Sequence, residues 1–267
     1  MEGFELKEPF DAVKIRDTLI KMIKEFTDNA GIKRVVLGIS GGKDSSVAAA
    51  LCARALGREN VYGIMLPDGE QKDISDSVRI CESLRINART VNIGEMHNAL
   101  KEAVLPHLSE DFFADGEASS RAEHESNINV GPRLRMTTLR YIAQSLGAFL
   151  CGTGNLSEAT VGYCTKDGDT SCDFNPLGRL TSKEVAAVGL TMDELPKELV
   201  NKAPTDGLSG MTDEEKLGIT YQAIHDYIRK GTSGDEKTDE LILKKYRGSA
   251  HKRRMPSVFD AFSERVI

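Results

Sequence analysis

The sequence lacks the closely spaced cysteine pairs that mark many zinc and redox sites. Its five cysteines stand at positions 52, 81, 151, 164 and 172, and no two of them have CxxC spacing. We therefore expect neither a zinc ribbon nor a thioredoxin-type redox site. Unpaired thiols fit a reducing compartment. Cys52 and Cys151 lie in apolar stretches, which predicts that they are small core residues.

Long hydrophobic runs and an excess of basic residues are also missing. No apolar segment approaches the roughly 20 residues that a membrane-spanning helix needs, and residues 1–5 have neither the basic nor the apolar region of a signal peptide. The 35 Lys and Arg against 41 Asp and Glu give a net charge of −6, which argues against a nonspecific nucleic-acid binder. With 24 glycines and 8 prolines in 267 residues, the chain is neither collagen-like nor disordered. These absences predict a soluble, cytoplasmic protein with no membrane or nucleic-acid partner.

What the sequence does contain is a repeated alternation of short apolar runs and longer amphipathic segments. Predicted strands cover residues 35–39, 60–66, 88–93 and 148–151, and predicted helices cover residues 10–29, 47–56, 74–84, 96–105 and 133–146. The first run, Val35 to Ile39, is continuously apolar and predicts a strand buried on both faces. Strands that alternate with helices of this length indicate βαβ units. The predicted fold class is α/β, a parallel twisted sheet flanked by helices, with residues 1–267 as one domain.

Several segments depart from this alternation. Residues 109–126 are polar and acidic and predict an exposed loop, with mobility expected at about 109–127. Pro132 is expected to start the helix that contains Arg133. The irregular stretch 152–180 is typical of functional loops. Residues 212–215 have the pattern of a capping box, which predicts a helix that runs to about Ile228.

A glycine-rich turn, Ser40-Gly41-Gly42-Lys43-Asp44-Ser45, separates the first predicted strand from the helix that follows. The backbone N–H groups of such a turn and of the helix N-terminus converge on one point, which suits a pyrophosphate. The carboxylate of Asp44 would repel phosphates unless Mg²⁺ lies between them. The spacing excludes a Walker A motif, because three residues rather than four separate Gly38 from Gly42. A turn that only closes a βα unit remains the simpler alternative.

The string in this turn resembles the pyrophosphate-binding loop of the ATP pyrophosphatase (PP-loop) superfamily, whose members cleave ATP between the α and β phosphates and adenylate a substrate oxygen. Further strings follow in order: Gly152-Thr153-Gly154-Asn155-Leu156-Ser157-Glu158, Gly162 to Asp169, Asp173 to Leu177, Lys202-Ala203-Pro204-Thr205 and His251 to Pro256. Together they resemble the ammonia-dependent NAD⁺ synthetase family over about Lys33 to Asp260. The resemblance implies an adenine nucleotide alpha hydrolase-like fold. It also implies a homodimer, with the first helix and the Arg133 helix as candidate interface elements.

The same resemblance implies the reaction. ATP would activate the carboxyl group of deamido-NAD⁺ as an acyl-adenylate, pyrophosphate would leave, and ammonia would then displace AMP to form NAD⁺. Mg²⁺ is the implied cofactor, and ATP is a co-substrate. Glutamine-dependent relatives carry an additional amidase domain, whereas only about 32 residues precede the first predicted strand here. We therefore expect free ammonia as the nitrogen donor, unless a separate glutaminase subunit supplies it.

Roles for individual residues are likewise implied by the resemblance. The predicted catalytic residues are Asp44, Ser45 and Glu158, of which Asp44 and Glu158 would bind Mg²⁺. The residues expected to bind ATP are Gly38, Ile39, Ser40, Gly41, Gly42, Lys43, Asp44, Ser45, Thr153, Lys183 and Thr205. Those expected to bind deamido-NAD⁺ are Arg133, Lys166, Asp173, His251 and Lys252.

The sequence departs from the family pattern in three places that bear on these roles. One is Gly131-Pro132-Arg133, where the family tends to have Lys-Ala-Arg. The family has a lysine two positions after the leucine matching Leu180, where this chain has Ser182 followed by Lys183. An ATP contact from Lys183 would therefore need a shifted register. Residues 206–210 contain two glycines, and we expect a hinged lid over ATP at about 206–212.

Several of these residues also have a simpler interpretation. Glu158 can be a solvated helix residue, Lys166 and Asp173 can be ordinary loop charges, and His251 can be a surface residue of a basic run. Two alternative functions are a tRNA-modifying PP-loop ligase and a nucleotide-binding regulatory module without catalysis. The missing CxxC pair and the acidic net charge argue against the first, and the presence of both Asp44 and Glu158 argues against the second.

Overall fold

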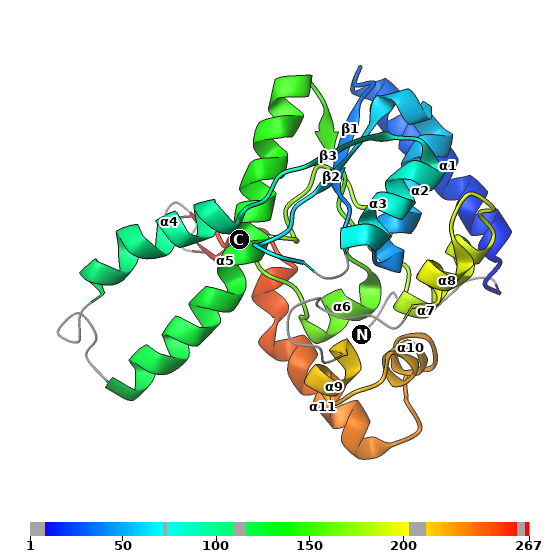
Figure 1. Ribbon diagram of the computed structural model, residues 1–267. Coiled ribbons are helices and arrows are strands. Elements are labelled where there is room, and N and C mark those ends of the chain that lie inside the picture. Colours follow the sequence, from blue (N-terminus) through cyan, green and yellow to red (C-terminus); the bar gives the residue numbers. More distant parts are fainter. Residues whose placement is uncertain (1–8, 72–73, 109–115, 203–211, 261–264, 267) are drawn as a thin grey trace.

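A four-stranded parallel sheet lies at the centre of the computed structural model, which describes residues 9–71, 74–108, 116–202, 212–260 and 265–266. Its strands are β1 (Val35–Gly38), β2 (Val61–Met65), β3 (Asn87–Thr90) and β4 (Phe149–Leu150), in the spatial order β3-β2-β1-β4 (Figure 1). Every pairing between them is parallel. The predicted α/β class with a parallel sheet flanked by helices is confirmed, and each predicted strand is present within about three residues of its expected ends.

Helices cover both faces of this sheet, because the side chains of β1 alternate between the two faces. Val35 and Leu37 belong to a buried cluster that includes residues of α1 (Ala12–Asn29), α2 (Lys43–Leu56), α3 (Ile74–Leu84), α7 (Ser182–Leu190) and α8 (Lys197–Val200). Val36 points to the other face, where it joins a second cluster with the C-terminal half of α5 (Gly116–Leu146). The two-sided burial predicted for this strand is therefore confirmed.

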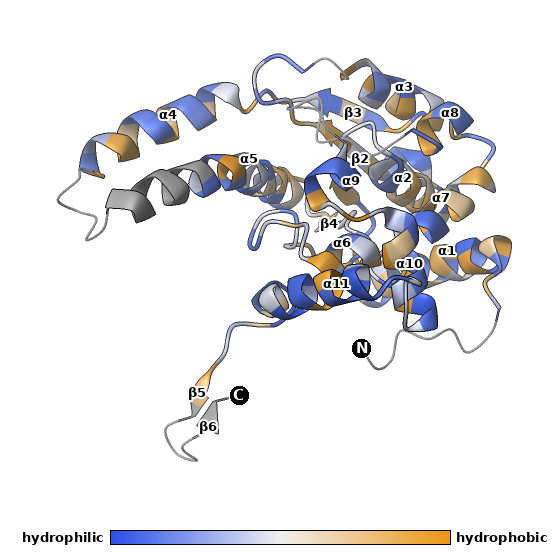
Figure 2. Ribbon diagram, turned by 90° about the horizontal axis from the view of Figure 1, so that it is seen from below, coloured by the Kyte–Doolittle hydropathy of each residue, from blue (hydrophilic) through white to orange (hydrophobic). Residues whose placement is uncertain are grey.

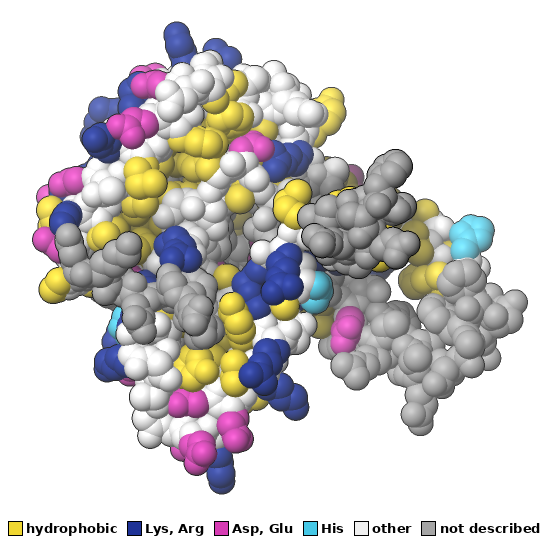
Figure 3. Space-filling model, turned by 180° about the vertical axis from the view of Figure 1, so that it is seen from behind, with side chains coloured by type: hydrophobic (Ala, Val, Ile, Leu, Met, Phe, Trp, Pro, Cys, Tyr) yellow, Lys and Arg dark blue, Asp and Glu magenta, His cyan; other side chains and the backbone are white. Residues whose placement is uncertain are grey.

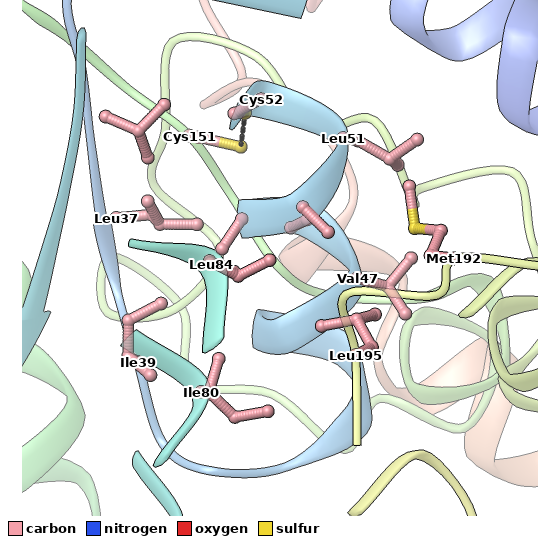
Figure 4. Packing of buried hydrophobic residues seen from close by; sticks show 14 of the residues in the cluster. Leu37, Ile39, Val47, Leu51, Cys52, Ile80, Leu84, Cys151, Met192 and Leu195 are labelled. Atoms are coloured by element: carbon pink, nitrogen blue, oxygen red, sulfur yellow. Dashed lines mark hydrogen bonds between the residues drawn. The ribbon is translucent and has the colours of Figure 1, made fainter. Parts of the chain in front are cut away.

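Helix α2 is the most deeply enclosed helix of the larger cluster. Its residues from Ser45 to Cys52 are all buried, and the small alanine side chains among them let neighbouring helices approach closely. Figure 4 shows residues of α2 packed between Leu37 of β1 and Met192. The sulfur of Cys52 lies 3.8 Å from that of Cys151, and both residues are buried (Figure 4). The prediction that these two cysteines are core residues is confirmed.

A separate group of helices packs beyond the carboxyl ends of the strands. It comprises α6 (Leu156–Val161), α9 (Asp213–Leu217), α10 (Tyr221–Lys230) and α11 (Glu236–Gly248), which appear together below the sheet in Figure 1. Their shared core is centred on the fully buried Ile224 and Ile242. Among the residues that the structure describes, short 3₁₀ turns lie at Arg58–Asn60, Leu105–His107 and Ala250–Lys252. Strands β5 (Phe259–Asp260) and β6 (Arg265–Val266) form a small antiparallel pair apart from the main sheet.

Helix α4 (Gly94–Val104) and the N-terminal half of α5 project from the body as an arm (Figures 1 and 2). Hydrophobic side chains are exposed on this arm, as Figure 3 shows from behind. On α4 they include Met96, Leu100 and Val104, which follow one another at intervals of four residues and so share one face. Across the described ranges, no helix has the length and apolar character needed to cross a bilayer.

Three predictions about secondary structure are wrong. The expected loop over 109–126 is helical from Gly116 onward, and Pro132 lies inside α5 rather than at its start. A proline removes one helical hydrogen bond, but α5 is held before Pro132 by a hydrogen bond from Thr165 to Asn129 at 2.8 Å and after it by packing against β1 and β4. The helix expected from Asp213 to Ile228 is instead two helices, α9 and α10, because Gly218 ends the first with a left-handed φ of 67°. Of the two segments expected to be mobile, residues 109–115 of the first and residues 206–211 of the second are outside the described residues.

Candidate active site

A cavity of about 420 Å³ opens at the carboxyl ends of β1, β2 and β4. Ligands of open α/β sheets bind at this edge, since the loops that leave parallel strands converge there. The glycine-rich turn after β1 forms one wall of the cavity, and residues 152–154 after β4 form another. The side of α5 that carries Arg135, Met136 and Leu139 covers the cavity from the second face of the sheet.

The backbone of the turn is shaped by contacts that only glycine permits. Gly41 has a left-handed φ of 81°, and a Cβ atom placed on it would lie 2.9 Å from Cβ of Asp76 and 3.0 Å from the backbone nitrogen of Ser77. The start of α3 therefore presses directly against the turn. The hydroxyl of Ser45 donates to the Gly42 carbonyl at 3.1 Å and accepts from the Ser40 N–H at 3.2 Å. These contacts hold the turn open in front of the N-terminus of α2.

Two carboxylates stand beside this turn and are joined through one asparagine. The Asn155 side chain donates from Nδ2 to Oδ1 of Asp44 at 3.1 Å, while its backbone N–H donates to Oε2 of Glu158 at 2.9 Å. Asn155 is also the N-cap of α6, and Glu158 closes the capping box of that helix. The N-cap of α6 therefore places the Glu158 carboxylate beside the first turn of α2, although the two segments are more than a hundred residues apart in the sequence. Lys43 contributes the nearest cation, with Nζ 2.8 Å from Oδ2 of Asp44.

The electrostatics of this pair are unusual. Burial, and then repulsion by Asp44, raise the pKa of Glu158 from 4.5 to about 8, although the Asn155 N–H and Lys43 act in the opposite direction. In the absence of a cation, Glu158 therefore holds a proton near neutral pH. An arrangement that keeps two acidic groups together against their repulsion is typical of a functional site rather than of a stability element.

A polar cluster closes the cavity on the side of α9 and α10. Asp213 accepts hydrogen bonds from the hydroxyls of Tyr163 at 3.1 Å and Tyr221 at 3.2 Å. The ammonium group of Lys43 lies 5.5 Å from the centre of the Tyr221 ring, a cation–π distance. Burial raises the pKa of Tyr163 to about 12, and burial together with Glu158 raises that of Tyr221 further. Both hydroxyls therefore remain protonated donors, and Asp213 is held as an acceptor.

The structure brings most of the predicted ATP and metal residues to one place. The predicted residues that line the cavity are Gly38, Ile39, Ser40, Gly41, Gly42, Lys43, Asp44, Ser45, Thr153 and Glu158. Lys183 is not among them, because its ammonium group binds Oε1 of Gln222 on α10. Thr205 is outside the described residues.

The residues predicted to bind deamido-NAD⁺ lie outside the lining of the cavity. Arg133 is exposed, and its Nε donates to the Lys166 carbonyl at 3.4 Å, so these two residues are neighbours. Asp173 pairs with Arg140 at 2.5 Å and accepts from the Leu150 N–H at 2.7 Å. Lys252 donates to two carbonyls of the loop after α6, at 2.9 and 2.6 Å. His251, next to it, is exposed. Their substrate contacts remain predictions.

Sequence reasoning missed several residues that line the cavity: Asp68, Asp76, Arg135, Tyr163, Asp169, Lys202 and Asp213. Two of them carried a usable signal. Asp68 follows a predicted strand within the turn Pro67-Asp68-Gly69, at the same edge of the sheet as the glycine-rich turn. Asp213 lies in the capping box at residues 212–215. Tyr163, Asp169 and Lys202 lie in strings quoted for the family resemblance, which gave them no role. Arg135 had no local signal, because only the packing of α5 directs it toward the cavity.

The fold and the cavity define a class of protein: an α/β nucleotide-binding protein with a pyrophosphate-binding turn at the carboxyl end of its first strand. Within that class the chain belongs to the NAD synthase family, whose model matches residues 15–256. It is 34% identical to an NH₃-dependent NAD⁺ synthetase from Archaeoglobus fulgidus, over 92% of this chain and 96% of the relative.

Solved structures give the same assignment. An NMN synthetase from Francisella tularensis superposes with a TM-score of 0.81 at 30% identity, covering 92% of this chain and 97% of that one. An NH₃-dependent NAD synthetase from Campylobacter jejuni superposes with a TM-score of 0.72 at 26% identity, covering 94% of this chain and all of that one.

Proposed function

We propose that this chain is an ATP-dependent amide ligase that converts the carboxylate of deamido-NAD⁺ to the carboxamide of NAD⁺, with ammonia as the nitrogen donor. The observation that carries the proposal is the meeting of the glycine-rich turn, Asp44 and Glu158 in one cavity. Membership of the NAD synthase family and the names of the relatives support it. The same membership does not favour a tRNA-modifying ligase.

The chemistry follows from the weakness of a carboxylate as an electrophile. A carboxylate oxygen of the substrate attacks the α-phosphorus of ATP, the bond to the β-phosphate breaks, and pyrophosphate leaves. Ammonia then attacks the acyl carbon, loses a proton, and expels AMP. The turn at Gly41 and the N-terminus of α2 direct N–H groups at the departing phosphates. No protein nucleophile is needed, so catalysis by this chain consists of positioning and charge stabilisation.

The donor set beside the turn fits Mg²⁺. Asp44 and Glu158 supply hard oxygen ligands, and burial together with repulsion by Asp44 raises the pKa of Glu158, a repulsion that a bound cation would offset. Among the described residues no group of three or more potential metal ligands is present. Mg²⁺ is commonly bound by one or two carboxylates together with substrate phosphates and water. We propose that Asp44 and Glu158 hold the ion, which when bound would neutralise charge on the leaving pyrophosphate.

A direct assay tests the proposed function. The purified chain is incubated with deamido-NAD⁺, ATP, Mg²⁺ and ammonium, and NAD⁺, AMP and pyrophosphate are quantified. We expect the three products in equal amounts, and glutamine in place of ammonium should give no NAD⁺. Consumption of ATP without formation of an amide product would overturn the proposal.

A second candidate substrate is favoured by one observation. The NMN synthetase from Francisella tularensis superposes more closely than the Campylobacter jejuni NAD synthetase, with TM-scores of 0.81 and 0.72. The carboxylated mononucleotide, nicotinate mononucleotide, would undergo the same amidation at the same site. Measuring kcat/KM for the mononucleotide and for deamido-NAD⁺ with one enzyme preparation decides between them, because the better substrate has the larger value.

We also propose that the chain forms a homodimer through α1 and the C-terminal half of α5. Both elements border β4, an edge strand of the sheet. Met22 and Phe26 on α1 are exposed by 56% and 42%, and Tyr141 on α5 by 75%. The Phe26 ring also lies 5.5 Å from that of Phe149, so the exposed apolar face of α1 continues onto β4. An isologous contact would cover it in both copies.

The oligomeric state provides the test. Tyr141→Asp should convert a dimer to a monomer in sedimentation velocity at micromolar concentration, because it places a charge in the contact. Leu100→Asp, on the exposed face of α4, is the matched control and should leave the dimer intact. Dissociation by the Leu100 variant alone would place the interface on the arm and refute this assignment.

We propose the cytoplasm as the site of action. All five cysteines are free thiols, and three of them are buried. Such a set fits a reducing compartment.

A further inference from the structure

Asp68 is a cavity residue to which neither the turn nor the proposed metal site assigns a role. It follows β2 directly after Leu66 and Pro67, and it lines the same cavity as the glycine-rich turn that follows β1. Strands β1 and β2 are parallel neighbours. Asp68 therefore lies one strand away from the proposed phosphate site, at the same edge of the sheet. In dinucleotide-binding α/β folds, an acidic residue in this position accepts a hydrogen bond from a ribose hydroxyl while the turn after the first strand binds phosphate.

The side chain of Asp68 is held in place before any ligand binds. Its Oδ2 lies 2.7 Å from Nδ1 of His97, which comes from the start of α4. The other ring nitrogen of His97 is buried and has no hydrogen-bond partner within the described residues. A buried ring nitrogen without a partner is unfavourable. Within the described residues, the hydrogen bond between Nδ1 and Asp68 is therefore the polar contact that holds the His97 ring.

The backbone of the turn that carries Asp68 is fixed as well. Asn92 accepts hydrogen bonds from the N–H groups of Gly69 and Gly94 at 3.1 and 2.9 Å, and it donates to the Gly69 carbonyl at 2.9 Å. On the opposite side, Nε of Arg135 donates to the Leu66 carbonyl at 2.9 Å. The loop is therefore tied to α4 and to α5, and a hydrogen bond from a ligand to Asp68 would require little further ordering.

The other carboxylate oxygen is available for a ligand. Oδ1 of Asp68 receives no hydrogen bond from the part of the chain that the structure describes, and the side chain retains 18% exposure at the cavity. Arg135 also lines the cavity, and its charge interacts with that of Asp68. A preorganised, partly desolvated carboxylate with one free oxygen suits a pair of hydroxyl donors on adjacent carbons.

We infer that Asp68 recognises the ribose hydroxyls of a bound nucleotide, and so makes the enzyme selective for ribonucleotides over deoxyribonucleotides. The inference rests on the proposed function, because it assumes that a nucleotide occupies this cavity. Two nucleotides take part in the reaction, ATP and the carboxylated nicotinate nucleotide, and both carry the same hydroxyl pair. The chemistry that Asp68 recognises is common to them, and the experiment separates the two sources.

The test compares ribose and deoxyribose substrates in the wild type and in Asp68→Ala. With saturating deamido-NAD⁺, kcat/KM is measured for ATP, 2′-deoxy-ATP and 3′-deoxy-ATP. We expect the wild type to prefer ATP by about 10- to 100-fold, the effect of a hydrogen bond to a charged group, and Asp68→Ala to show less than about threefold preference. Asp76→Ala is the matched control, because Asp76 is another carboxylate of the cavity, paired with Lys202 at 2.7 Å. This variant should keep the wild-type ratio between kcat/KM for ATP and kcat/KM for deoxy-ATP, even where its overall rate falls.

The second arm varies the sugar of the acid nucleotide. If Asp68→Ala abolishes the discrimination between nicotinate mononucleotide and its 2′-deoxyribosyl analogue while the ATP ratio is unchanged, the recognised ribose belongs to the acid nucleotide. If neither ratio changes, the inference is wrong, and Asp68 only connects β2 to α4. Failure of the wild type to form any amide product would instead refute the proposed function, so the two failures are distinguishable.

Discussion

Replacing Glu158 by glutamine should stabilise the ligand-free protein at about pH 8 while it abolishes amide formation. Burial and the neighbouring Asp44 raise the pKa of Glu158 to about 8 in the folded chain, against the ordinary 4.5 expected after unfolding. Between these two values the folded state keeps a proton that the unfolded state releases. The free energy of unfolding contributed by this group therefore falls as the pH rises from about 4.5 to about 8. Glutamine cannot ionise, so the variant does not undergo this loss.

The size of the effect follows from the shift. One pKa unit corresponds to about 1.4 kcal/mol of free energy. The shift from 4.5 to about 8 therefore means that ionising Glu158 in the folded chain costs at most about 5 kcal/mol of stability. Part of that cost is repulsion by Asp44 rather than the burial of Glu158 itself. We expect Glu158→Gln to gain about 2 kcal/mol relative to the wild type at about pH 8, and almost nothing at about pH 5.

Urea unfolding in EDTA measures this difference, and Glu184 provides a matched control of opposite sign. Burial alone would raise the pKa of Glu184, but hydrogen bonds from Arg229 and the Thr181 N–H outweigh burial and lower it. The stabilisation from Glu184 is therefore present above about pH 4.5 and is lost only as the pH falls through its lowered pKa. Glu184→Gln should destabilise the protein by about 2 kcal/mol or more at both pH values, because it weakens a buried pair with Arg229.

A specific result would refute this reasoning. If Glu158→Gln has the same free energy of unfolding as the wild type at about pH 8, Glu158 is neither desolvated nor repelled by Asp44 in solution. If it is less stable at both pH values, as Glu184→Gln should be, the ionised carboxylate of Glu158 stabilises the fold instead of destabilising it. In either case the proposed Mg²⁺ site would lose its electrostatic support.

Three further predictions concern the turn and its surroundings. Asp44→Asn should leave the fold intact, as judged by circular dichroism, and lower Mg²⁺-dependent pyrophosphate release by about a hundredfold or more; unchanged release would refute the metal role. Lys183→Ala should slow adenylation far less than Asp44→Asn does, because its ammonium group binds Gln222 outside the cavity; a larger loss than for Asp44→Asn would show that Lys183 contacts ATP. Gly41→Ala should raise KM for ATP strongly, because the added Cβ would collide with the start of α3. Gly69→Ala is the control: it has a similar φ of 75° but open space around it, and it should cost only about 1–2 kcal/mol of stability. Equal effects of the two variants on KM would mean that the crowding at Gly41 is unimportant.

Much of the fold could be predicted from local patterns. Val35 to Ile39 forms a strand buried on both faces because a continuously apolar run can be buried only between two layers. The alanine-rich segment over 47–56 forms most of α2, which ends at Leu56 before Gly57, as expected from helix propensity and the C-terminal glycine, although the helix begins four residues earlier, at Lys43. These elements depend on interactions between residues close in sequence.

Local patterns failed where contacts between distant segments outweigh them. Pro132 has the local pattern of a helix start, yet α5 continues through it, because Thr165 binds Asn129 before the proline and the sheet packs against the helix after it. The orientation of Lys183 was also decided by packing. The residue lies in the first turn of α7, on the side that faces Gln222 of α10, and this orientation takes its side chain away from the cavity.

By itself the sequence determined the α/β class, the glycine-rich turn after the first strand and the resemblance that named Asp44 and Glu158. Turn chemistry, apolar periodicity and the order of short strings are properties of neighbouring residues along the chain. Only the tertiary structure decided that Asn155 connects those two carboxylates, that Asp213 lies between two tyrosines, and that Asp68 faces the same cavity. Such contacts join residues from separate strands and helices, and their distances depend on how the layers pack, which no local pattern encodes.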